Sequence, residues 1–156
     1  GKGQYLNALN YLRSLHLQGA VDAPVVMKAL RHYLEKGGGV VHIISDFIDL
    51  EHPNDLLDLL PVPHWDTVLL HVLHPDEISP PVSGDLELMD IESGGTVNLD
   101  INKQALAEYQ RRIQSWQESL ALASIQKNSF YALIPATGDE KEVVAQLRKL
   151  RLVNAL

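Results

Sequence analysis

The chain of 156 residues is 46% hydrophobic, which is enough for one globular domain or a large part of one. It contains no cysteine, which excludes disulfides, zinc–thiolate sites and a thiol nucleophile and is compatible with a reducing, cytoplasmic compartment. No apolar run reaches the roughly 18 residues of a transmembrane helix, and the formal net charge is -7.

Charge is unevenly distributed along the chain. Residues 1–36 carry five Lys and Arg against two acids, and residues 103–156 carry eight against five, so each of these parts has a net charge of +3. Residues 37–102 contain thirteen Asp and Glu and no Lys or Arg, a net charge of -13. Nucleic-acid binding requires basic residues, so this acidic segment favours a cation or a basic protein surface as its partner. A solvated face that only keeps the protein soluble is an equal alternative.

Apolar spacing predicts two helices at the start of the chain. Over residues 4–17, apolar side chains recur every three to four positions, and Gly19 ends the pattern. Asp22 and the proline that follows at position 24 start a second helix, which ends at Lys36 before three glycines. Because these glycines precede a strand, they stop a helix and do not form a phosphate-binding loop.

The remaining elements predict an α/β fold. We expect strands over residues 40–45, 67–73 and 130–134, helices over 54–60, 102–127 and 140–152, a proline-rich loop at 75–81, and a hairpin of strands 85–91 and 96–101 turning at Ser93-Gly94-Gly95. The order α-α-β-α-β-hairpin-α-β-α is typical of a three-layer Rossmann-like sandwich with an inserted antiparallel hairpin. Such domains normally begin with a strand, so we expect the first strands to be missing.

Polar side chains follow two of the predicted strands. Ser45 and Asp46 end the first strand, and His74, Asp76 and Glu77 leave the tip of the second. Ligands of open α/β sheets bind at the carboxyl ends of the strands, so these residues are candidate contacts if the two strands are neighbours. The alternatives are that Asp46 caps a helix and that the two later acids only start the proline-rich loop.

Other residues have a structural interpretation. His42 and His71 lie inside strands, where a hydrogen-bonded core histidine is the common case. In the long helix, Ile113, Trp116 and Leu120 are spaced as a core face. The acids of the hairpin, Asp90 and Glu92, share one face of a strand at the surface, where they are solvated.

Three motifs carry a resemblance to a known family. Ile44–Phe47 reads ISDF, residues 74–77 read HPDE, and residues 90–94 read DIESG. In this order and spacing, and with a long helix that contains Tyr109 and Trp116, the chain resembles the bacterial domain-of-unknown-function 58 proteins, whose core is similar to a von Willebrand factor A domain. One difference is that His74 stands where the family usually has an acid.

The resemblance implies one truncated von Willebrand factor A-like domain over residues 1–156, with an acidic segment and hairpin at 37–102 and a helix-strand-helix unit at 102–156. Domains of this type bind a divalent metal at a metal-ion-dependent adhesion site made by an Asp-x-Ser-x-Ser motif, a Thr and a later Asp. Asp46 matches the last of these, but the first motif is absent and no Thr occurs near residues 19–22. We therefore expect Asp46 and Ser45 to be the remnant of a site that holds Mg²⁺ in the intact protein and is empty here, since Mg²⁺ needs six oxygen ligands.

The expected function is a non-catalytic protein-interaction domain, with no catalytic residue and no cofactor in this chain. The resemblance implies a MoxR-type AAA+ ATPase as partner, in a chaperone-like or cofactor-insertion role. The alternative is a metal-dependent hydrolase or phosphotransferase built on Asp46 and Asp49, although the acidic segment lacks the Lys that such enzymes place near a strand tip.

Missing strands would also affect assembly. Without an inner neighbour, the strand at residues 40–45 would be an exposed, apolar sheet edge. We expect a homo-oligomer formed through this edge, or a terminal helix that covers it.

Overall fold

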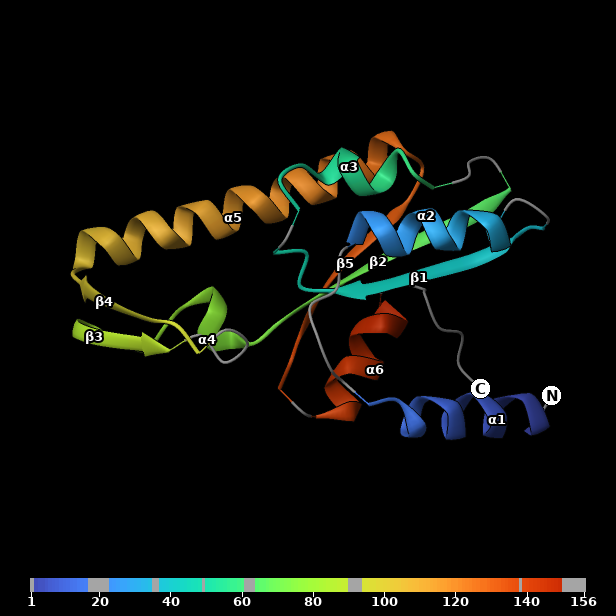
Figure 1. The fold of residues 1–156 in the computed structure, drawn as a ribbon, viewed down its shortest axis with the longest axis horizontal. Coiled ribbons are helices and arrows are strands. Elements are labelled where there is room, and N and C mark those ends of the chain that lie inside the picture. The colour runs from blue at the N-terminus through green and yellow to red at the C-terminus, as the bar shows by residue number, and fades with distance from the viewer. Residues whose placement is uncertain are drawn as a thin grey trace.

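The computed structural model describes residues 2–16, 23–34, 37–48, 50–60, 64–89, 94–137 and 139–149 (Figure 1). Its elements in chain order are α1 (Lys2–Ser14), α2 (Ala23–Leu34), β1 (Gly39–Ser45), α3 (Pro53–Leu57), β2 (Trp65–Leu73), α4 (Pro75–Ile78), β3 (Gly84–Met89), β4 (Thr96–Ile101), α5 (Lys103–Gln126), β5 (Phe130–Pro135) and α6 (Glu140–Lys149). The order matches the sequence-based prediction except at α4, which forms inside the expected proline-rich loop.

Two separate sheets form, as the sequence predicts for a mixed α/β fold. One is a parallel three-stranded sheet in the order β1-β2-β5, and the other is the antiparallel hairpin β3-β4. β2 is the central strand, with Ser45 of β1 opposite His71 and Leu133 of β5 on its other side. This register brings the carboxyl ends of β1 and β2 to the same edge of the sheet, called the carboxyl edge below.

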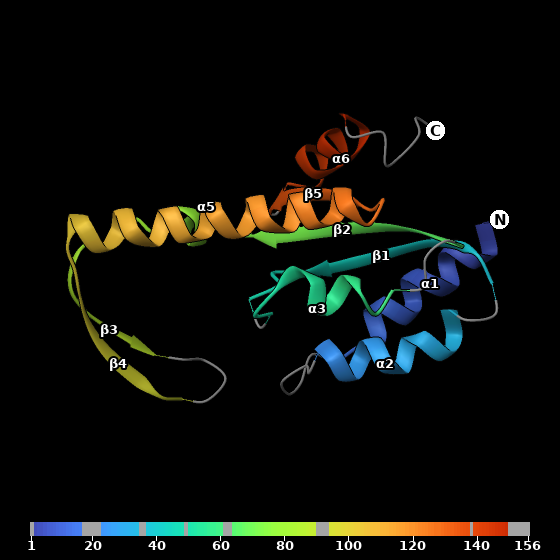
Figure 2. The same cartoon turned by 90° about the horizontal axis from the view of Figure 1, so that it is seen from above.

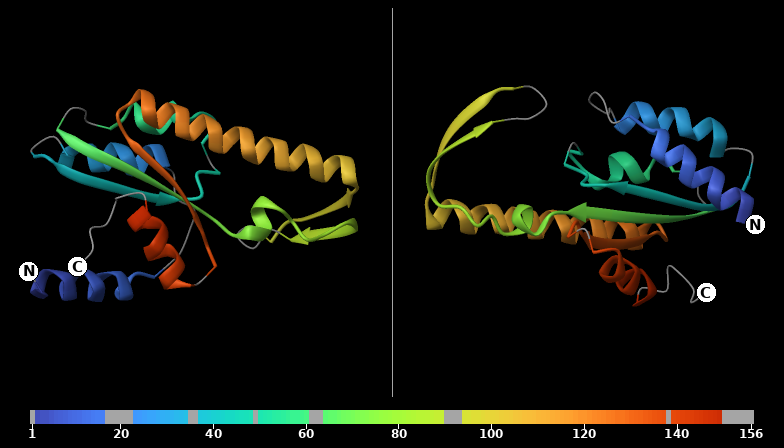
Figure 3. Two further views of the ribbon diagram at one scale, coloured as in Figure 1. Left: turned by 180° about the vertical axis from the view of Figure 1, so that it is seen from behind. Right: turned by 90° about the horizontal axis from the view of Figure 1, so that it is seen from below.

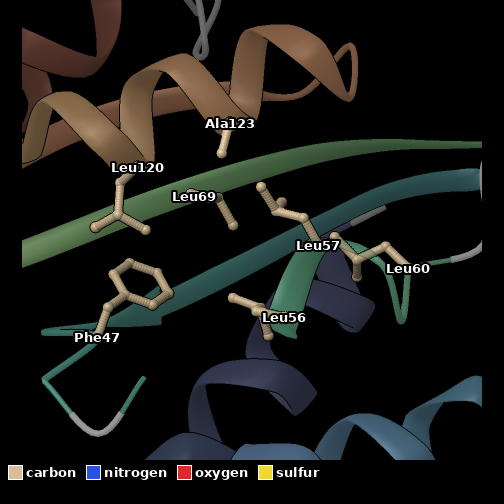
Figure 4. Close-up of a cluster of buried hydrophobic side chains, with 7 residues drawn as sticks. All are labelled: Phe47, Leu56, Leu57, Leu60, Leu69, Leu120 and Ala123. Atoms are coloured by element: carbon tan, nitrogen blue, oxygen red, sulfur yellow. The ribbon is translucent and has the colours of Figure 1, made fainter. Parts of the chain in front are cut away.

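The hydrophobic core lies between the sheet and the helices α3 and α5 (Figure 4). Its buried members are Phe47, Leu56, Leu57, Leu60, Leu69, Leu120 and Ala123. Trp116 packs against this cluster and Leu120 is fully buried, which confirms the predicted core face of the long helix. α6 lies on the other side of the sheet and contacts β5 (Figures 1 and 2).

The first half of α5 and the hairpin extend away from the sheet as an arm (Figures 1 and 3). The hairpin register pairs Leu86 with Leu99 and Leu88 with Val97 on one face, while Asp85 pairs with Asp100 on the other. The hairpin is therefore amphipathic, with its leucines on one face and its acids on the other beside Met89, because side chains alternate along a strand.

Three sequence-based expectations need correction or fall outside the described residues. On the predicted apolar stripe of residues 4–17, Leu6 and Leu12 of α1 and Leu15 just after it are exposed, so they are not part of the core. His42 is exposed, because it lies on the face of β1 that no core helix covers. Asp90 and Glu92, like Asp49 and residues 150–152 of the last predicted helix, lie outside the described residues.

None of the helices in the described part of the chain combines the length and the apolar character needed to cross a membrane.

Replacing Leu120 of α5 by Ala should lower the free energy of unfolding by about 2–5 kcal/mol, because this side chain is fully buried against α3 and β2. Urea denaturation followed by circular dichroism measures the change. The matched control is Leu122→Ala on the same helix, where the side chain is 62% exposed and the change should stay within about 0.5 kcal/mol. Equal losses for the two variants would contradict the core described above.

Candidate functional site at the carboxyl edge of the sheet

The tip of β1 is a tight turn held by its own polar side chains. The Ser45 hydroxyl accepts a hydrogen bond from the backbone N–H of Phe47 at 3.0 Å, and Asp46 Oδ1 accepts one from the N–H of Ile48 at 3.3 Å. Phe47 has a φ of 55°, a left-handed conformation that bulky residues rarely adopt. The turn holds the Phe47 ring in the core and leaves the Asp46 carboxylate exposed at the edge.

The tip of β2 runs directly into α4. His74 precedes this helix, and its Nδ1 accepts a hydrogen bond from the backbone N–H of Asp76 at 3.2 Å. Glu77 Oε2 in turn accepts one from the backbone N–H of His74 at 2.5 Å, so the two side chains form a reciprocal cap. Pro75 suits the first turn of a helix, which explains why this segment is helical and not a loop.

The α4 segment is tied to the long helix. The Tyr109 hydroxyl donates to the Glu77 carbonyl at 2.6 Å, and the Gln110 side-chain amide donates to the Ser79 hydroxyl at 3.1 Å. Burial and the nearby negative charge of Glu77 raise the pKa of Tyr109, so this hydroxyl keeps its proton and remains a donor. The carboxyl edge is thus fixed to the base of the arm.

His71 lies buried beneath this edge, at 1% exposure. Its Nδ1 is 2.8 Å from the Tyr131 hydroxyl, and its ring makes edge-to-face contacts with the rings of Phe47 and Tyr131. Its Nε2 has no hydrogen-bond partner in the described structure. Burial lowers the pKa of His71, while the backbone and charge of Asp46 and the charge of Glu77 act in the opposite direction.

The pair of His71 and Tyr131 is neutral. Burial raises the pKa of Tyr131 to about 12, so its hydroxyl stays protonated and donates to Nδ1 of the uncharged ring. A neutral ring that accepts at Nδ1 carries its proton on Nε2. Because the ring is shielded from solvent, this histidine is a structural support for the edge and is not placed to bind a ligand from solution.

The structure brings the predicted site residues together in two groups on one edge. Ser45 and Asp46 form the first, with Ser45 Oγ 3.4 Å from Asp46 Oδ1, and His74, Asp76 and Glu77 form the second. Among the described residues there is no group of three or more His, Asp or Glu side chains arranged to hold a metal ion. Asp46 and Ser45 instead direct polar atoms into their own turn, so they offer few oxygens to Mg²⁺.

Sequence reasoning missed the partnership of His71 with Tyr131. It predicted a hydrogen-bonded core histidine at His71, which the structure confirms, but it did not identify the partner. The signal available was a polar residue in each of two apolar strands, and only the parallel register of β2 with β5 places the two side chains side by side.

The chain belongs to the family described as protein of unknown function DUF58, whose model matches residues 6–119. A comparison with curated proteins found no match. A solved structure of an aerotolerance-related membrane protein from Bacteroides fragilis, crystallised with multiple mutations to serines, is similar over 93% of this chain and 69% of its own, with 14% sequence identity and a TM-score of 0.45.

The free energy of unfolding should decrease as the pH falls, because of His71. The unfolded chain protonates this histidine with a pKa near 6.5, while the folded protein does so only at lower pH. The neutral ring therefore contributes fully to the free energy of unfolding above about pH 7.5. This contribution decreases as the pH falls through about 6.5 towards the lowered pKa of the folded state, with a slope of at most about 1.4 kcal/mol per pH unit. Urea denaturation between pH 5.5 and 8 measures this dependence.

His71→Phe should remove this part of the pH dependence, at some cost in stability because Tyr131 loses its acceptor. The control is His42→Phe on the neighbouring strand, where the histidine is exposed and the slope should stay that of the wild type. If His71→Phe kept the wild-type slope, the buried histidine would not be its source.

Proposed function

We propose that this protein is a non-catalytic protein-interaction domain that binds a basic protein surface at its carboxyl edge. The observation that carries the proposal is that Asp46, Asp76 and Glu77 are exposed on one edge while each belongs to a turn or cap held by local hydrogen bonds. Ile48, which is 63% exposed, adds an apolar contact directly beside Asp46.

Fixed carboxylates suit recognition of Lys and Arg. Charges at an interface mainly increase the rate of encounter and select the partner, and they do so best when the binding geometry exists before contact. Residues 37–102 contain no Lys or Arg, so no basic side chain of this segment competes for these acids.

The family supports a more specific proposal for the partner. Through its resemblance to von Willebrand factor A-like proteins, the domain would bind a MoxR-type AAA+ ATPase in the cytoplasm, in a chaperone-like or cofactor-insertion role. Mg²⁺ would then belong to the intact protein, at a site to which Asp46 contributes.

A hydrolase or phosphotransferase that uses Asp46 is less well supported. A carboxylate nucleophile for phosphoryl transfer works beside positive groups that stabilise the transferred charge. Asp46 Oδ1 instead accepts hydrogen bonds from its own turn, and the segment around it, residues 37–102, contains no Lys or Arg.

The double variant Asp46→Asn with Asp76→Asn should weaken binding to the MoxR-type ATPase from the same organism by about tenfold at low salt, mainly through a slower association rate. Surface plasmon resonance over a series of salt concentrations measures the association rate and how far salt lowers it. Asp66→Asn is the matched control, because Asp66 is an exposed acid near the opposite end of β2 and its loss should leave binding unchanged.

Two results would contradict the proposal. One is equal weakening by the control and the double variant, which would indicate only an effect of net charge. The other is Mg²⁺-dependent turnover of a phosphate ester that Asp46→Ala abolishes, because this would make the protein an enzyme.

A further inference from the structure

The hairpin of β3 and β4 is a second surface, distinct from the carboxyl edge. It is a sheet of its own, in which β3 pairs with β4 alone among the described residues. β4 leads into α5 and contacts it, while β3 lies on the side of the arm away from α5 (Figures 1 and 3). The outer edge of β3 therefore has no strand beside it in the described part of the chain. The missing strands expected from the sequence belong beside β1 in the parallel sheet, so the open edge of β3 is a separate feature.

The side chains of β3 alternate between acids and leucines. Asp85 and Glu87 are exposed on one face, and Leu86 and Leu88 lie on the other, where Leu88 is 47% exposed. A strand added at this edge would continue both faces of the hairpin, because side chains alternate along every strand of a sheet. It would fit best with apolar side chains beside the leucines and cationic side chains beside the acids.

The acids favour a basic segment over a second copy of the chain. Asp85 lies directly opposite Asp100 in the hairpin register, and like charges in this position destabilise a pair of strands. A second β3 would bring further acids to the same face, whereas a Lys or Arg beside Asp85 would offset the repulsion. Residues 37–102 contain thirteen acids and no Lys or Arg, so this segment supplies no such cation itself.

The apolar face of the hairpin also favours a third strand. A hairpin of two strands is at best marginally stable in water, and a third strand with a hydrophobic face adds the burial that it lacks. On β4, Val97 is 57% exposed and Leu99 is 43% exposed, so the face that they share with Leu88 is largely open to solvent.

We propose that an extended segment of a partner protein, in which Lys or Arg alternates with apolar residues, adds to the outer edge of β3 as a third strand. Main-chain hydrogen bonds to β3 give this contact its affinity, and the alternating side chains give it its specificity. The acids of β3 have two effects, since they attract the basic segment and disfavour self-association of the hairpins.

This inference does not rest on the proposed function. The strand addition uses the edge of the hairpin, whereas the proposed ATPase contact uses the tips of β1 and β2. Failure of one proposal therefore leaves the other unaffected.

Short synthetic peptides labelled with fluorescein test the alternation. A peptide of alternating Lys and Val should bind the wild-type chain in fluorescence anisotropy. A control peptide of the same composition in the repeating order Lys-Lys-Val-Val should bind about tenfold more weakly, because it cannot place all its cations on one face. A peptide with the sequence of β3 should not bind, and tight binding of this peptide would instead indicate a second copy as the occupant and overturn the proposal.

Variants of the protein test the place of binding. Asp85→Lys with Glu87→Lys should weaken binding of the alternating peptide by about tenfold, because two attractive cross-strand pairs become repulsive. The hairpin should persist in this variant, because Asp85→Lys also removes the repulsion with Asp100. The matched control, Asp66→Lys with Glu118→Lys, changes the net charge equally at exposed positions outside the hairpin and should leave binding within about twofold.

N-methylation of the peptide tests strand pairing itself. Alternate N–H groups of a strand point to opposite edges, so methylating the backbone nitrogens of only the Lys or only the Val residues blocks one edge. One of the two methylated peptides should lose binding and the other should keep it. Equal affinities of the two methylated peptides, or equal weakening by the two double variants, would overturn the proposal, because charge alone would then account for binding.

Discussion

The fold depends on the central position of β2. This strand is hydrogen-bonded to β1 on one side and to β5 on the other, and its Leu69 is fully buried against α3 and α5. Strand pairing and core packing meet at Leu69, because this residue is paired with Ile43 and Tyr131 and also belongs to the buried cluster. The two edge strands thus take their positions from β2.

Phe47 links this core to the candidate site. Its ring is a member of the buried cluster and contacts His71, while its left-handed backbone leaves the adjacent Asp46 at the surface. A strained backbone conformation persists where the surroundings hold it, and here the Ser45 hydroxyl and the core do so. The geometry of the carboxyl edge therefore depends on the hydrophobic burial of the adjacent Phe47 ring.

Much of the fold could be predicted from the sequence because its signals are local. The apolar runs of β1 and β2, the glycines after α2 and the spacing of Trp116 and Leu120 identify strands, a helix stop and a core face within short windows. α4 was not predicted, because its four residues are too few to show a helical periodicity. Its caps were recognised only from the hydrogen bonds of His74 and Glu77 in the structure.

The candidate site was only partly predictable for a related reason. Neighbouring parallel strands ending in polar residues place Ser45 and His74 at one edge, and the sequence contains that information. The pairing of His71 with Tyr131 spans 60 residues and depends on register, which no local pattern encodes. The exposure of His42 depends on which face the helices cover, and this is likewise a property of the assembled layers.

The long helix α5 connects the hydrophobic core to the hairpin. It is about 36 Å long, with one end packed in the core through Leu120 and the other joined to the hairpin. Between these ends, the Tyr109 hydroxyl donates a hydrogen bond to the Glu77 carbonyl. A displacement of the hairpin would therefore reach α4 and the tip of β2 through this hydrogen bond, so the position of the arm is coupled to the edge that carries the exposed acids.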